Sequence, residues 1–127
     1  MMISTGNALV IEDDPFMRSA VGALLRKLGY DVRSAANGDE ALRMALDWTA
    51  DVVVTDVEMP VMDGLQTTRN LRGMGGIWAT VPIIGFSAKD TPAAGSDCIA
   101  AGMNALVPKG GGYAGLRATL NSLMAVA

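Results

Sequence analysis

Short apolar runs alternate along this chain with longer segments in which apolar and polar positions follow helical spacing. The short runs are mostly β-branched and of strand length, which is typical of strands buried on both faces of a parallel sheet. These predicted strands are Ala8–Ile11, Val32–Ala35, Val52–Thr55, Pro82–Phe86 and Ala105–Val107. The predicted helices are Pro15–Leu28, Asp39–Trp48, Leu65–Leu71, Pro92–Ala101 and a last one from about Tyr113. Strands that each precede a helix predict an α/β domain of (βα)5 type.

The predicted helices carry local signals at their ends and along one face. Asp14 and Pro15 are typical of an N-cap residue followed by the first helical residue. In the second helix, Leu42, Ala45 and Leu46 have the i, i+3, i+4 spacing that forms one apolar face. These signals support helices that pack against a sheet through one side.

The alternation predicts a doubly wound parallel five-stranded sheet, with right-handed crossovers that place helices on both faces. Among doubly wound arrangements, we choose the flavodoxin-like strand order 2-1-3-4-5. In that order Ala105–Val107 lies at one edge, where Pro108 is tolerated because it need not donate a hydrogen bond to a neighbour. No linker, repeat or second core is visible, so residues 1–127 are predicted to form a single domain.

Composition limits the chemistry that this domain can perform. Hydrophobic residues make up 50% and charged residues 18% of the chain, a balance that favours a folded domain over a disordered one. The chain has no histidine, which excludes a Ser-His-Asp triad, a histidine general base and histidine-containing metal sites. Its single cysteine, Cys98, excludes an internal disulfide and a thiolate cluster.

The charge distribution disfavours nucleic-acid binding and favours a function that uses carboxylates. The formal net charge of −3 disfavours a nucleic-acid-binding surface. No apolar run approaches the roughly 18 residues of a membrane span, and the N-terminus lacks the basic region of a signal peptide, so we expect a cytoplasmic domain without membrane contact. Residues 1–64 hold 11 acidic side chains and residues 65–127 hold 2, so functional carboxylates are expected in the first half.

Four of the predicted strands end in residues that carry chemistry. These residues are Glu12, Asp13 and Asp14 after the first strand, Asp56 after the third, Ser87 after the fourth and Lys109 after the fifth. Ligands of open α/β sheets bind outside the carboxyl ends of the strands, so these side chains are expected to converge. Taken singly, the first three also suit a capped helix start, and Asp56 suits a turn; their joint placement favours a site.

A cluster of carboxylates at this edge of the sheet requires a cation, because closely packed carboxylates raise one another's pKa. Mg²⁺ suits such a site because it binds one or two carboxylates, keeps water ligands and accepts phosphate oxygens. Asp56, at the end of the central strand, is then a candidate nucleophile that forms an aspartyl-phosphate. Lys109 and Ser87 are the candidates to hold the oxygens of the transferred phosphoryl group.

The most specific motif is the stretch Asp56–Gly64, which reads DVEMPVMDG. It occurs in order with the acidic pair Glu12 and Asp13, the hydroxyl residue Ser87 and the lysine Lys109. In these residues and their spacing, the chain resembles the receiver domain of two-component response regulators over essentially its whole length. Each motif alone is weak, but the set is highly specific to that family.

The resemblance implies a switch that is turned on by phosphorylation. Asp56 would accept a phosphoryl group from a histidine kinase or a histidine phosphotransfer protein, and Ser87 would move toward it. The face formed by the fourth helix, the fifth strand and the fifth helix would then change and contact a downstream protein target. The segment Ser96–Asn104 looks most like receivers of hybrid kinases and phosphorelays.

The same resemblance implies how Mg²⁺ would be held. Asp13, Asp56 and the backbone carbonyl of Glu58 would bind it directly, and Glu12 would bind it through water. Glu58 and Lys89 are both expected to flank the mouth of the site, where they could pair. Such a pair would act on the access of water or phosphodonor, and hence on the lifetime of the phosphoryl group.

Two positions depart from the family pattern. Leu106 stands where the family usually carries the Tyr or Phe whose rotamer follows the movement of the switch hydroxyl. Gly110 stands where a proline usually follows the lysine, and it begins a run of glycines. We therefore expect a trans peptide bond after Lys109, since a cis bond costs about 3 kcal/mol without proline, and a more mobile loop.

The sequence alone leaves two other functions as alternatives. A receiver fold whose switching has degenerated would be a constitutive interaction module, as Leu106 and Gly110 suggest. A small flavin-binding domain would have the same strand order, but an acidic pocket repels a cofactor phosphate and no Gly/Ser/Thr-rich phosphate loop follows the first strand. The main hypothesis is a single-domain response regulator or phosphorelay intermediate that catalyses only its own phosphorylation and dephosphorylation.

Overall fold

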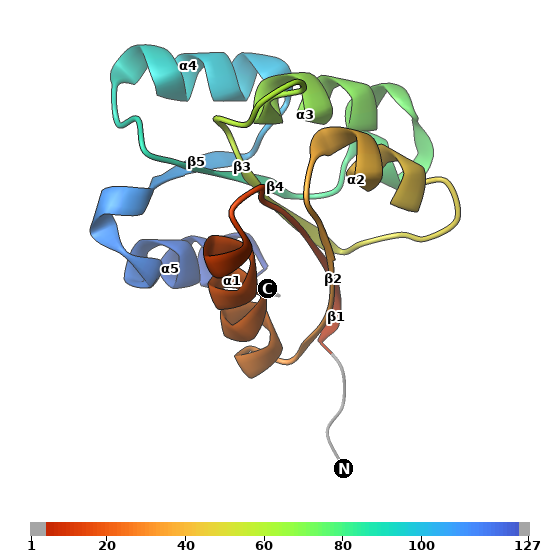
Figure 1. The fold of residues 1–127 in the computed structure, drawn as a ribbon, viewed down its shortest axis with the longest axis horizontal. Helices are drawn as coiled ribbons and strands as arrows, with labels where there is room; N and C mark the ends of the chain where they lie inside the picture. Colours follow the sequence, from red (N-terminus) through yellow and green to blue (C-terminus); the bar gives the residue numbers. More distant parts are fainter. Residues whose placement is uncertain (1–4, 125–127) are drawn as a thin grey trace.

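The computed structural model describes residues 5–124, which form a parallel sheet with helices on both faces (Figure 1). Its strands are β1 (Gly6–Ile11), β2 (Tyr30–Ala35), β3 (Val52–Asp56), β4 (Ile83–Ser87) and β5 (Ala105–Pro108). Its α-helices are α1 (Pro15–Lys27), α2 (Gly38–Met44), α3 (Gly64–Gly73), α4 (Pro92–Ala101) and α5 (Tyr113–Leu123). Two short 3₁₀ helices are η1 (Gly76–Ala79) and η2 (Lys109–Gly111).

The strand order is β2-β1-β3-β4-β5, and neighbouring strands are parallel. This confirms the doubly wound fold and the predicted order. The central strand β3 lies between β1 and β4, so the residues that follow these three strands emerge side by side at one edge of the sheet. β5 is an edge strand, and Pro108 ends it opposite Ser87, where no further strand needs its missing N–H.

Each face of the sheet has its own apolar core, because successive residues of a strand point to opposite sides. Leu9 and Val53 belong to the core under α2, α3 and α4, and Cys98 of α4 is fully buried there. Val10 and Val54 belong to the core under α1 and α5. Figure 1 shows the same division, with α1 and α5 on one side of the sheet and the other three helices opposite.

Side-chain caps fix where two helices begin beside the carboxyl edge of the sheet. Asp14 accepts a hydrogen bond from the backbone N–H of Phe16 at 2.9 Å, and Pro15 is the first residue of α1, as predicted. Asp63 accepts a hydrogen bond from the backbone N–H of Gln66 at 2.8 Å and begins α3. Both caps satisfy backbone donors that the first helical turn leaves free.

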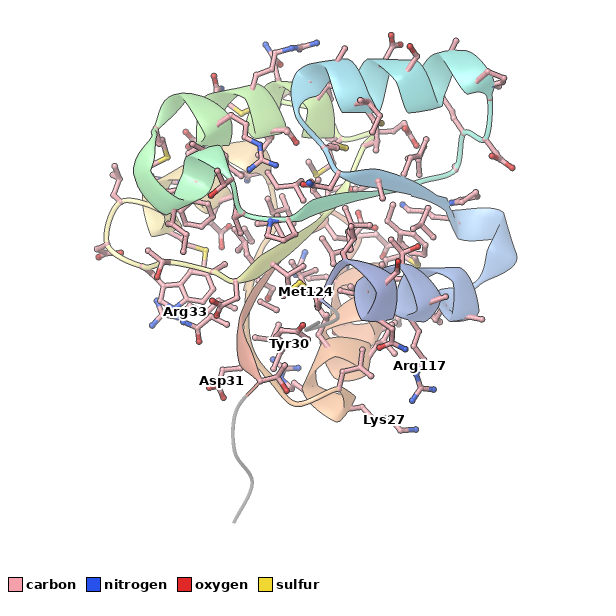
Figure 2. The ribbon with its side chains drawn as sticks, turned by 180° about the vertical axis from the view of Figure 1, so that it is seen from behind. Lys27, Tyr30, Asp31, Arg33, Arg117 and Met124 are labelled. Carbon is pink, nitrogen blue, oxygen red and sulfur yellow. The ribbon has the colours of Figure 1, made fainter. Side chains whose placement is uncertain are left out.

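The second helix is shorter than predicted: it ends at Met44 and not at Trp48. Beyond it, the backbone N–H of Leu46 donates to the carbonyl of Arg43 at 3.2 Å, which marks a tighter turn. The Leu46 side chain is 76% exposed, so its predicted place on the apolar face is wrong. The ring of Trp48 lies beside β2, with its centroid 4.9 Å from the guanidinium of Arg33. Figure 2 labels Arg33. The chain leaves the helical path here and runs toward β3, where the carbonyl of Thr49 accepts a hydrogen bond from Nδ2 of Asn7 at 3.1 Å.

Candidate functional site

Three carboxylates meet at the carboxyl edge of the sheet. Glu12 and Asp13 follow β1, and Asp56 ends β3; because Ile11 and Thr55 are register partners, the two chain segments emerge together. One carboxylate oxygen from each of the three acidic residues lies within 4.8 Å of the others. Glu12 and Asp56 are only 3% and 5% exposed, whereas Asp13 is exposed to solvent. The predicted acidic cluster is therefore assembled, with one of its members accessible from outside.

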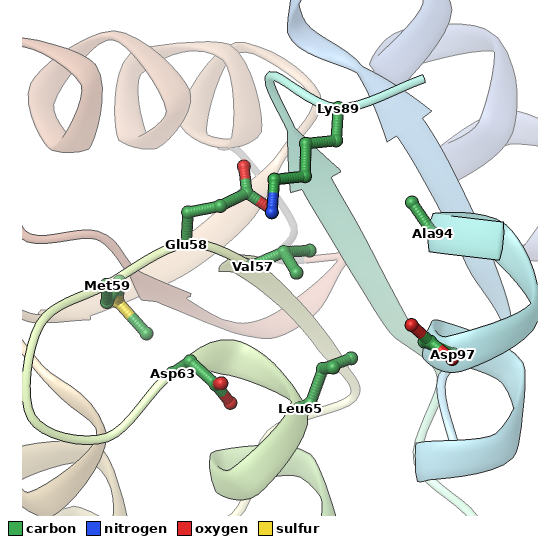
Figure 3. Close-up of a pocket in the computed structure, with 8 residues that line it drawn as sticks. All are labelled: Val57, Glu58, Met59, Asp63, Leu65, Lys89, Ala94 and Asp97. Carbon is green, nitrogen blue, oxygen red and sulfur yellow. The ribbon is translucent and has the colours of Figure 1, made fainter. Parts of the chain in front are cut away.

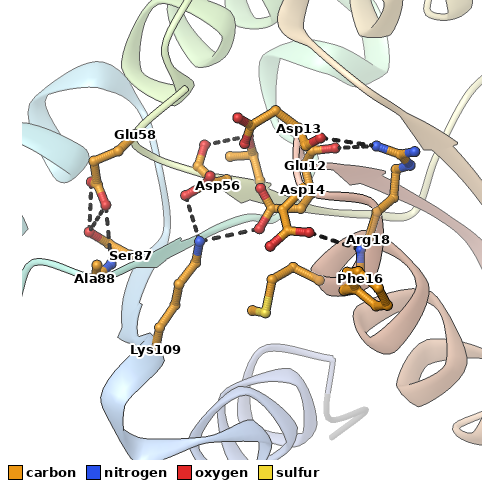
Figure 4. A network of polar contacts seen from close by, with 12 residues as sticks. Glu12, Asp13, Asp14, Phe16, Arg18, Asp56, Glu58, Ser87, Ala88 and Lys109 are labelled. Atoms are coloured by element: carbon orange, nitrogen blue, oxygen red, sulfur yellow. Dashed lines mark hydrogen bonds and ion pairs between the residues drawn. The ribbon is translucent and has the colours of Figure 1, made fainter. Parts of the chain in front are cut away.

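Lys109 reaches this cluster from the end of β5. Its Nζ lies 3.0 Å from Oδ1 of Asp56 and 3.2 Å from Oε1 of Glu12 (Figure 4). Burial lowers the pKa of Lys109, but the hydrogen bond and charge of Asp56, followed by those of Glu12, outweigh it and raise the pKa above its usual value. The ammonium also lies 5.8 Å from the ring centroid of Phe86. The charged ammonium of Lys109 is therefore held against the carboxylate of Asp56, the candidate nucleophile.

Glu12 has one oxygen without a partner. Its Oε1 accepts from Lys109, whereas Oε2 is the one buried side-chain polar atom, among the described residues, that lacks a hydrogen-bond partner. Burial, followed by the nearby carboxylate of Asp56, raises the pKa of Glu12 from 4.5 to about 8. The single ammonium of Lys109 therefore compensates this buried carboxylate and its two acidic neighbours only in part.

A hard divalent cation fits this donor set. Glu12, Asp13 and Asp56 could each offer a carboxylate oxygen, and such ions prefer oxygen ligands. The unpartnered Oε2 of Glu12 supports the same conclusion, because it leaves a buried acceptor for a metal-bound water or for the ion itself. Three carboxylates face one ammonium here, so an added cation would also lower their mutual repulsion.

Ser87, which ends β4, is fully buried and is held by Glu58. Its Oγ lies 2.7 Å and 2.9 Å from the two carboxylate oxygens of Glu58, and the backbone N–H of Ala88 donates to one of these oxygens at 3.1 Å. The backbone N–H of Lys89 in turn donates to Ser87 Oγ at 3.0 Å. The expected pairing of Glu58 with Lys89 is not found: among residues 5–124, the Lys89 side chain takes part in no ion pair.

The loop between β3 and α3 packs closely on the end of β3. The backbone N–H of Gly64 donates to the carbonyl of Val57 at 2.8 Å. A Cβ at Gly64 would press on the carbonyl of Asp56 and lie 2.9 Å from Cα of Val57. Met59 is buried in the core beneath this loop. The glycine of the motif is therefore required by the close approach of two backbones.

The two departures from the family pattern have structural counterparts. Leu106 is half-buried and packs against the core under α2, α3 and α4. No cis peptide bond occurs among the described residues, so the bond after Lys109 is trans, as expected. Aromatic rings lie instead on the other side of the sheet, where the centroids of Phe86 and Tyr113 are 6.1 Å apart. No local spacing predicts this pair, because its members belong to β4 and α5.

Arg18 is a further residue that sequence reasoning missed. From α1, its Nη1 donates to the backbone carbonyl of Glu12 at 2.9 Å, as Figure 4 shows. This bond ties the loop after β1 to the helix that follows, and so fixes the direction of the acidic residues. A single arginine within a helix carries no sequence signal for this role.

Two cavities flank the cluster. One, of about 380 Å³, lies between the β3–α3 loop and α4; Glu58, Lys89 and Asp97 are among its lining residues (Figure 3). The other, of about 460 Å³, is lined by residues that include Asp13 and Met62. The acidic cluster is therefore open to solvent on the side of Asp13, and the group formed by Glu58 and Ser87 borders a separate cleft.

The sequence model of the response regulator receiver domain family matches residues 8–121. The chain is 33% identical over 120 residues to hybrid signal transduction histidine kinase E of Dictyostelium discoideum, an alignment that covers 92% of this chain and 7% of that protein. It is 34% identical over 101 residues to the sensor histidine kinase RcsC of Escherichia coli (strain K12), which covers 80% of this chain and 10% of the relative.

Solved structures agree with the sequence matches. A chemotaxis response regulator of Vibrio cholerae superposes with a TM-score of 0.87 and 29% identity over 94% of this chain and 99% of the other. The receiver domain of a sensor histidine kinase from Pseudomonas aeruginosa PAO1 superposes with a TM-score of 0.84 and 32% identity over 95% of this chain and 98% of the other. In that second structure a magnesium ion is coordinated in the active site cleft.

The chain therefore belongs to the response regulator receiver domain family. It is a receiver domain of the kind found in response regulators and hybrid histidine kinases, which are signalling domains and not enzymes in the ordinary sense. It spans only 7% and 10% of the two curated relatives named above, so their full activities belong to much longer chains. In the part of the chain that the structure describes, no helix has the length and apolar character of a membrane span.

Proposed function

We propose that this domain is a phosphorylation-dependent switch that accepts a phosphoryl group on Asp56. The observation that carries the proposal is the setting of the Asp56 carboxylate, which is buried beside Glu12 and Asp13 with the Nζ of Lys109 3.0 Å from its Oδ1. A carboxylate oxygen attacks the phosphorus of a phosphohistidine, the P–N bond breaks with its electrons left on the histidine nitrogen, and an aspartyl-phosphate remains.

The phosphodonor is a histidine kinase or a histidine phosphotransfer protein. None of the 127 residues is a histidine, so the donor imidazole must come from outside this sequence. Asp13 is the exposed member of the acidic cluster, which leaves that side of the site open to an approaching protein. Hybrid histidine kinases among the relatives favour this class of donor.

Lys109 and Ser87 are proposed to hold the transferred group. The Lys109 ammonium already contacts Asp56, and its raised pKa keeps it charged, so it offsets the negative charge that develops on the phosphoryl oxygens. The Ser87 hydroxyl supplies a hydrogen bond from the neighbouring strand. Residues of three adjacent strands thus surround one phosphoryl group.

Mg²⁺ is the proposed metal. Asp13, Asp56 and the backbone carbonyl of Glu58 would bind it directly, and Glu12 through water, which would satisfy the free Oε2 of Glu12. When bound, the ion offsets the charge of the phosphoryl oxygens. The magnesium ion in the cleft of the similar Pseudomonas aeruginosa receiver supports this choice.

We also propose that residues 1–127 act as a single receiver domain in the cytoplasm, which signals by contact with a downstream protein and binds neither nucleic acid nor membrane. The face of α4, β5 and α5, which includes Leu106, is the proposed contact surface. The only reactions proposed for the domain are its own phosphorylation and dephosphorylation. A constitutive module is not favoured, because the carboxylates, the hydroxyl and the lysine of a phosphoacceptor site are present together.

The test is incubation of the purified protein with acetyl phosphate and Mg²⁺, followed by mass spectrometry of the intact chain. The wild type should gain the mass of one phosphoryl group, and chelation of the metal should prevent the gain. Asp56→Asn should gain nothing, because an amide is not a nucleophile at phosphorus. No gain in the wild type, or an equal gain in Asp56→Asn, would contradict the proposal.

A further inference from the structure

The carboxylate of Glu58 occupies the hydroxyl of Ser87, which the proposed function assigns to a phosphoryl group on Asp56, and with it the neighbouring N–H of Ala88. Ser87 Oγ lies 2.7 Å from Oε2 of Glu58, and the backbone N–H of Ala88 lies 3.1 Å from Oε1. One anion is thus bound in bidentate fashion by an O–H and an N–H. These donors stand at the end of β4, directly beside the end of β3, where Asp56 lies. Figure 4 shows this group on one side of Asp56 and Lys109, with Asp13 on the other.

The Ser87 hydroxyl has a single proton to donate. Its oxygen accepts the backbone N–H of Lys89 at 3.0 Å, which fixes Oγ from the opposite direction, and the side chain is fully buried. While the proton points at Glu58, it cannot also point at a phosphoryl oxygen. Hydrogen bonds to a carboxylate are stronger than those to neutral acceptors, so the arrangement resists opening.

We propose that Glu58 is an internal competitor of the phosphoryl group: its carboxylate binds Ser87 and Ala88 in the resting domain and must leave before they can bind the phosphorylated Asp56. This inference rests on the function proposed above. A competitor of this kind lowers the apparent affinity for the phosphoryl group by the fraction of time for which the donors are free. Glu58 is thereby a positioning residue that sets the threshold of the switch.

The structure offers a place for the displaced carboxylate. Glu58 and Lys89 line the same cleft of about 380 Å³, and Figure 3 shows their side chains extending toward one another. In the resting domain Lys89 takes part in no ion pair among the described residues. A carboxylate released from Ser87 can therefore turn toward this ammonium without crossing the core.

The experiment uses beryllofluoride with saturating Mg²⁺ as a non-covalent stand-in for the phosphoryl group, with affinity measured by calorimetry. Glu58→Ala keeps the backbone carbonyl but frees Ser87 and Ala88, and should tighten binding by about tenfold. Glu58→Gln, which keeps the shape of the side chain, should tighten it less. Asp97→Asn is the matched control, because it removes a negative charge from the same cleft without a contact to Ser87, and should change affinity by less than about twofold.

A double-mutant cycle with Ser87→Ala separates competition from simple charge repulsion. In the Ser87→Ala background the effect of Glu58→Ala should shrink to less than about threefold, because one of the contested donors is gone. An undiminished effect in that background, an equal effect of Asp97→Asn, or no effect of Glu58→Ala on a wild type that does bind would overturn the inference alone. If neither the wild type nor any variant binds beryllofluoride, the proposed function fails and the inference falls with it.

Discussion

Glu12 shows how a single buried residue makes the stability of this domain depend on pH. The folded protein holds the pKa of Glu12 at about 8, through burial and then the neighbouring Asp56, whereas the usual value is 4.5. Between these values the folded state keeps a proton that the unfolded chain has lost. The free energy of unfolding should therefore fall as pH rises toward about 8, by at most about 1.4 kcal/mol per pH unit.

This prediction is checked by thermal unfolding in metal-free buffer between pH 5 and pH 9. The wild type should lose stability as pH rises, and Glu12→Gln, which cannot ionise, should lose much less. Asp31→Asn is a suitable control, because Asp31 is an exposed acid near the beginning of β2, away from the acidic cluster, and its replacement should leave the slope unchanged. An equally steep loss in Glu12→Gln would show that another group governs the pH dependence.

At the scale of single elements, the junction of β3 and α3 depends on the absence of one side chain. A Cβ at Gly64 would meet the backbone of Asp56 and Val57, which cannot give way as a flexible side chain can. Gly64→Ala should lower the free energy of unfolding by about 1–3 kcal/mol and slow phosphorylation, because the end of β3 carries the nucleophile. Chemical denaturation and the acetyl phosphate assay measure the two effects.

Gly73→Ala is the matched control at the other end of the same helix. A Cβ there has no heavy atom within 4 Å, so the substitution should be neutral or stabilise the helix by at most about 1 kcal/mol. Phosphorylation should proceed at the wild-type rate. If Gly64→Ala behaves like Gly73→Ala, the close backbone approach at the junction does not matter in solution.

Arg72 of α3 joins elements at the amino-terminal ends of the strands, opposite the acidic cluster. Its guanidinium donates to the carbonyl oxygens of Gly102, at 2.7 Å and 3.0 Å, of Val81 at 2.7 Å and of Trp78 at 3.0 Å. It also donates to Oδ1 of Asn104 at 3.0 Å. The residue thus connects α3 with the segments that lead into β4 and β5. Burial lowers its pKa, but the guanidinium stays charged at neutral pH.

Arg72→Met should lower the free energy of unfolding by about 3 kcal/mol, because several partly buried carbonyl groups lose their donor at once. Urea denaturation measures the loss. Arg69→Met on the same helix replaces an exposed arginine and should change stability by less than about 0.5 kcal/mol. The folded Arg72→Met protein should still be phosphorylated on Asp56, since the two sites lie at opposite edges of the sheet. Equal effects of the two arginine variants would contradict this account.

At the scale of the whole molecule, metal binding should stabilise the fold, because the acidic cluster joins the ends of β1 and β3 and is absent in the unfolded chain. At a Mg²⁺ concentration about 100 times its dissociation constant, the free energy of unfolding should rise by about 2.7 kcal/mol. Asp13→Asn should reduce that gain, and a chelator should abolish it in the wild type. Thermal unfolding with and without Mg²⁺ measures the gain.

The control for the metal prediction is Asp47→Asn, which removes an exposed carboxylate outside the acidic cluster. This variant should keep the full gain in stability. If Asp13→Asn and Asp47→Asn respond alike to Mg²⁺, the ion acts through general charge screening and not through the cluster.

The sequence by itself determined the alternation of strands and helices and the end of the sheet at which the chemistry lies, whereas the strand order 2-1-3-4-5 was one choice among doubly wound arrangements that the structure then confirmed. Apolar runs and helix caps such as Asp14 depend on residues a few positions apart, so local spacing is enough to place them. In a parallel sheet the residues that follow the strands gather at the carboxyl ends of those strands. The predicted topology therefore placed Asp56 and Lys109 near one another, as the structure shows. The same reasoning misjudged the end of α2, which lies at Met44, because the chain beyond it bonds to a distant segment, as in the hydrogen bond from Asn7 to the carbonyl of Thr49.

Only the tertiary structure decided which partner each of these groups takes. Glu58 binds Ser87 and not Lys89, Glu12 keeps one oxygen free, and Arg72 joins α3 to the segments before β4 and β5. Each outcome depends on side chains far apart in sequence meeting within hydrogen-bond distance, where a shift of one ångström exchanges one partner for another. Sequence spacing can place such residues at the same edge of a sheet, but the choice among neighbouring donors follows from the packing of the whole domain.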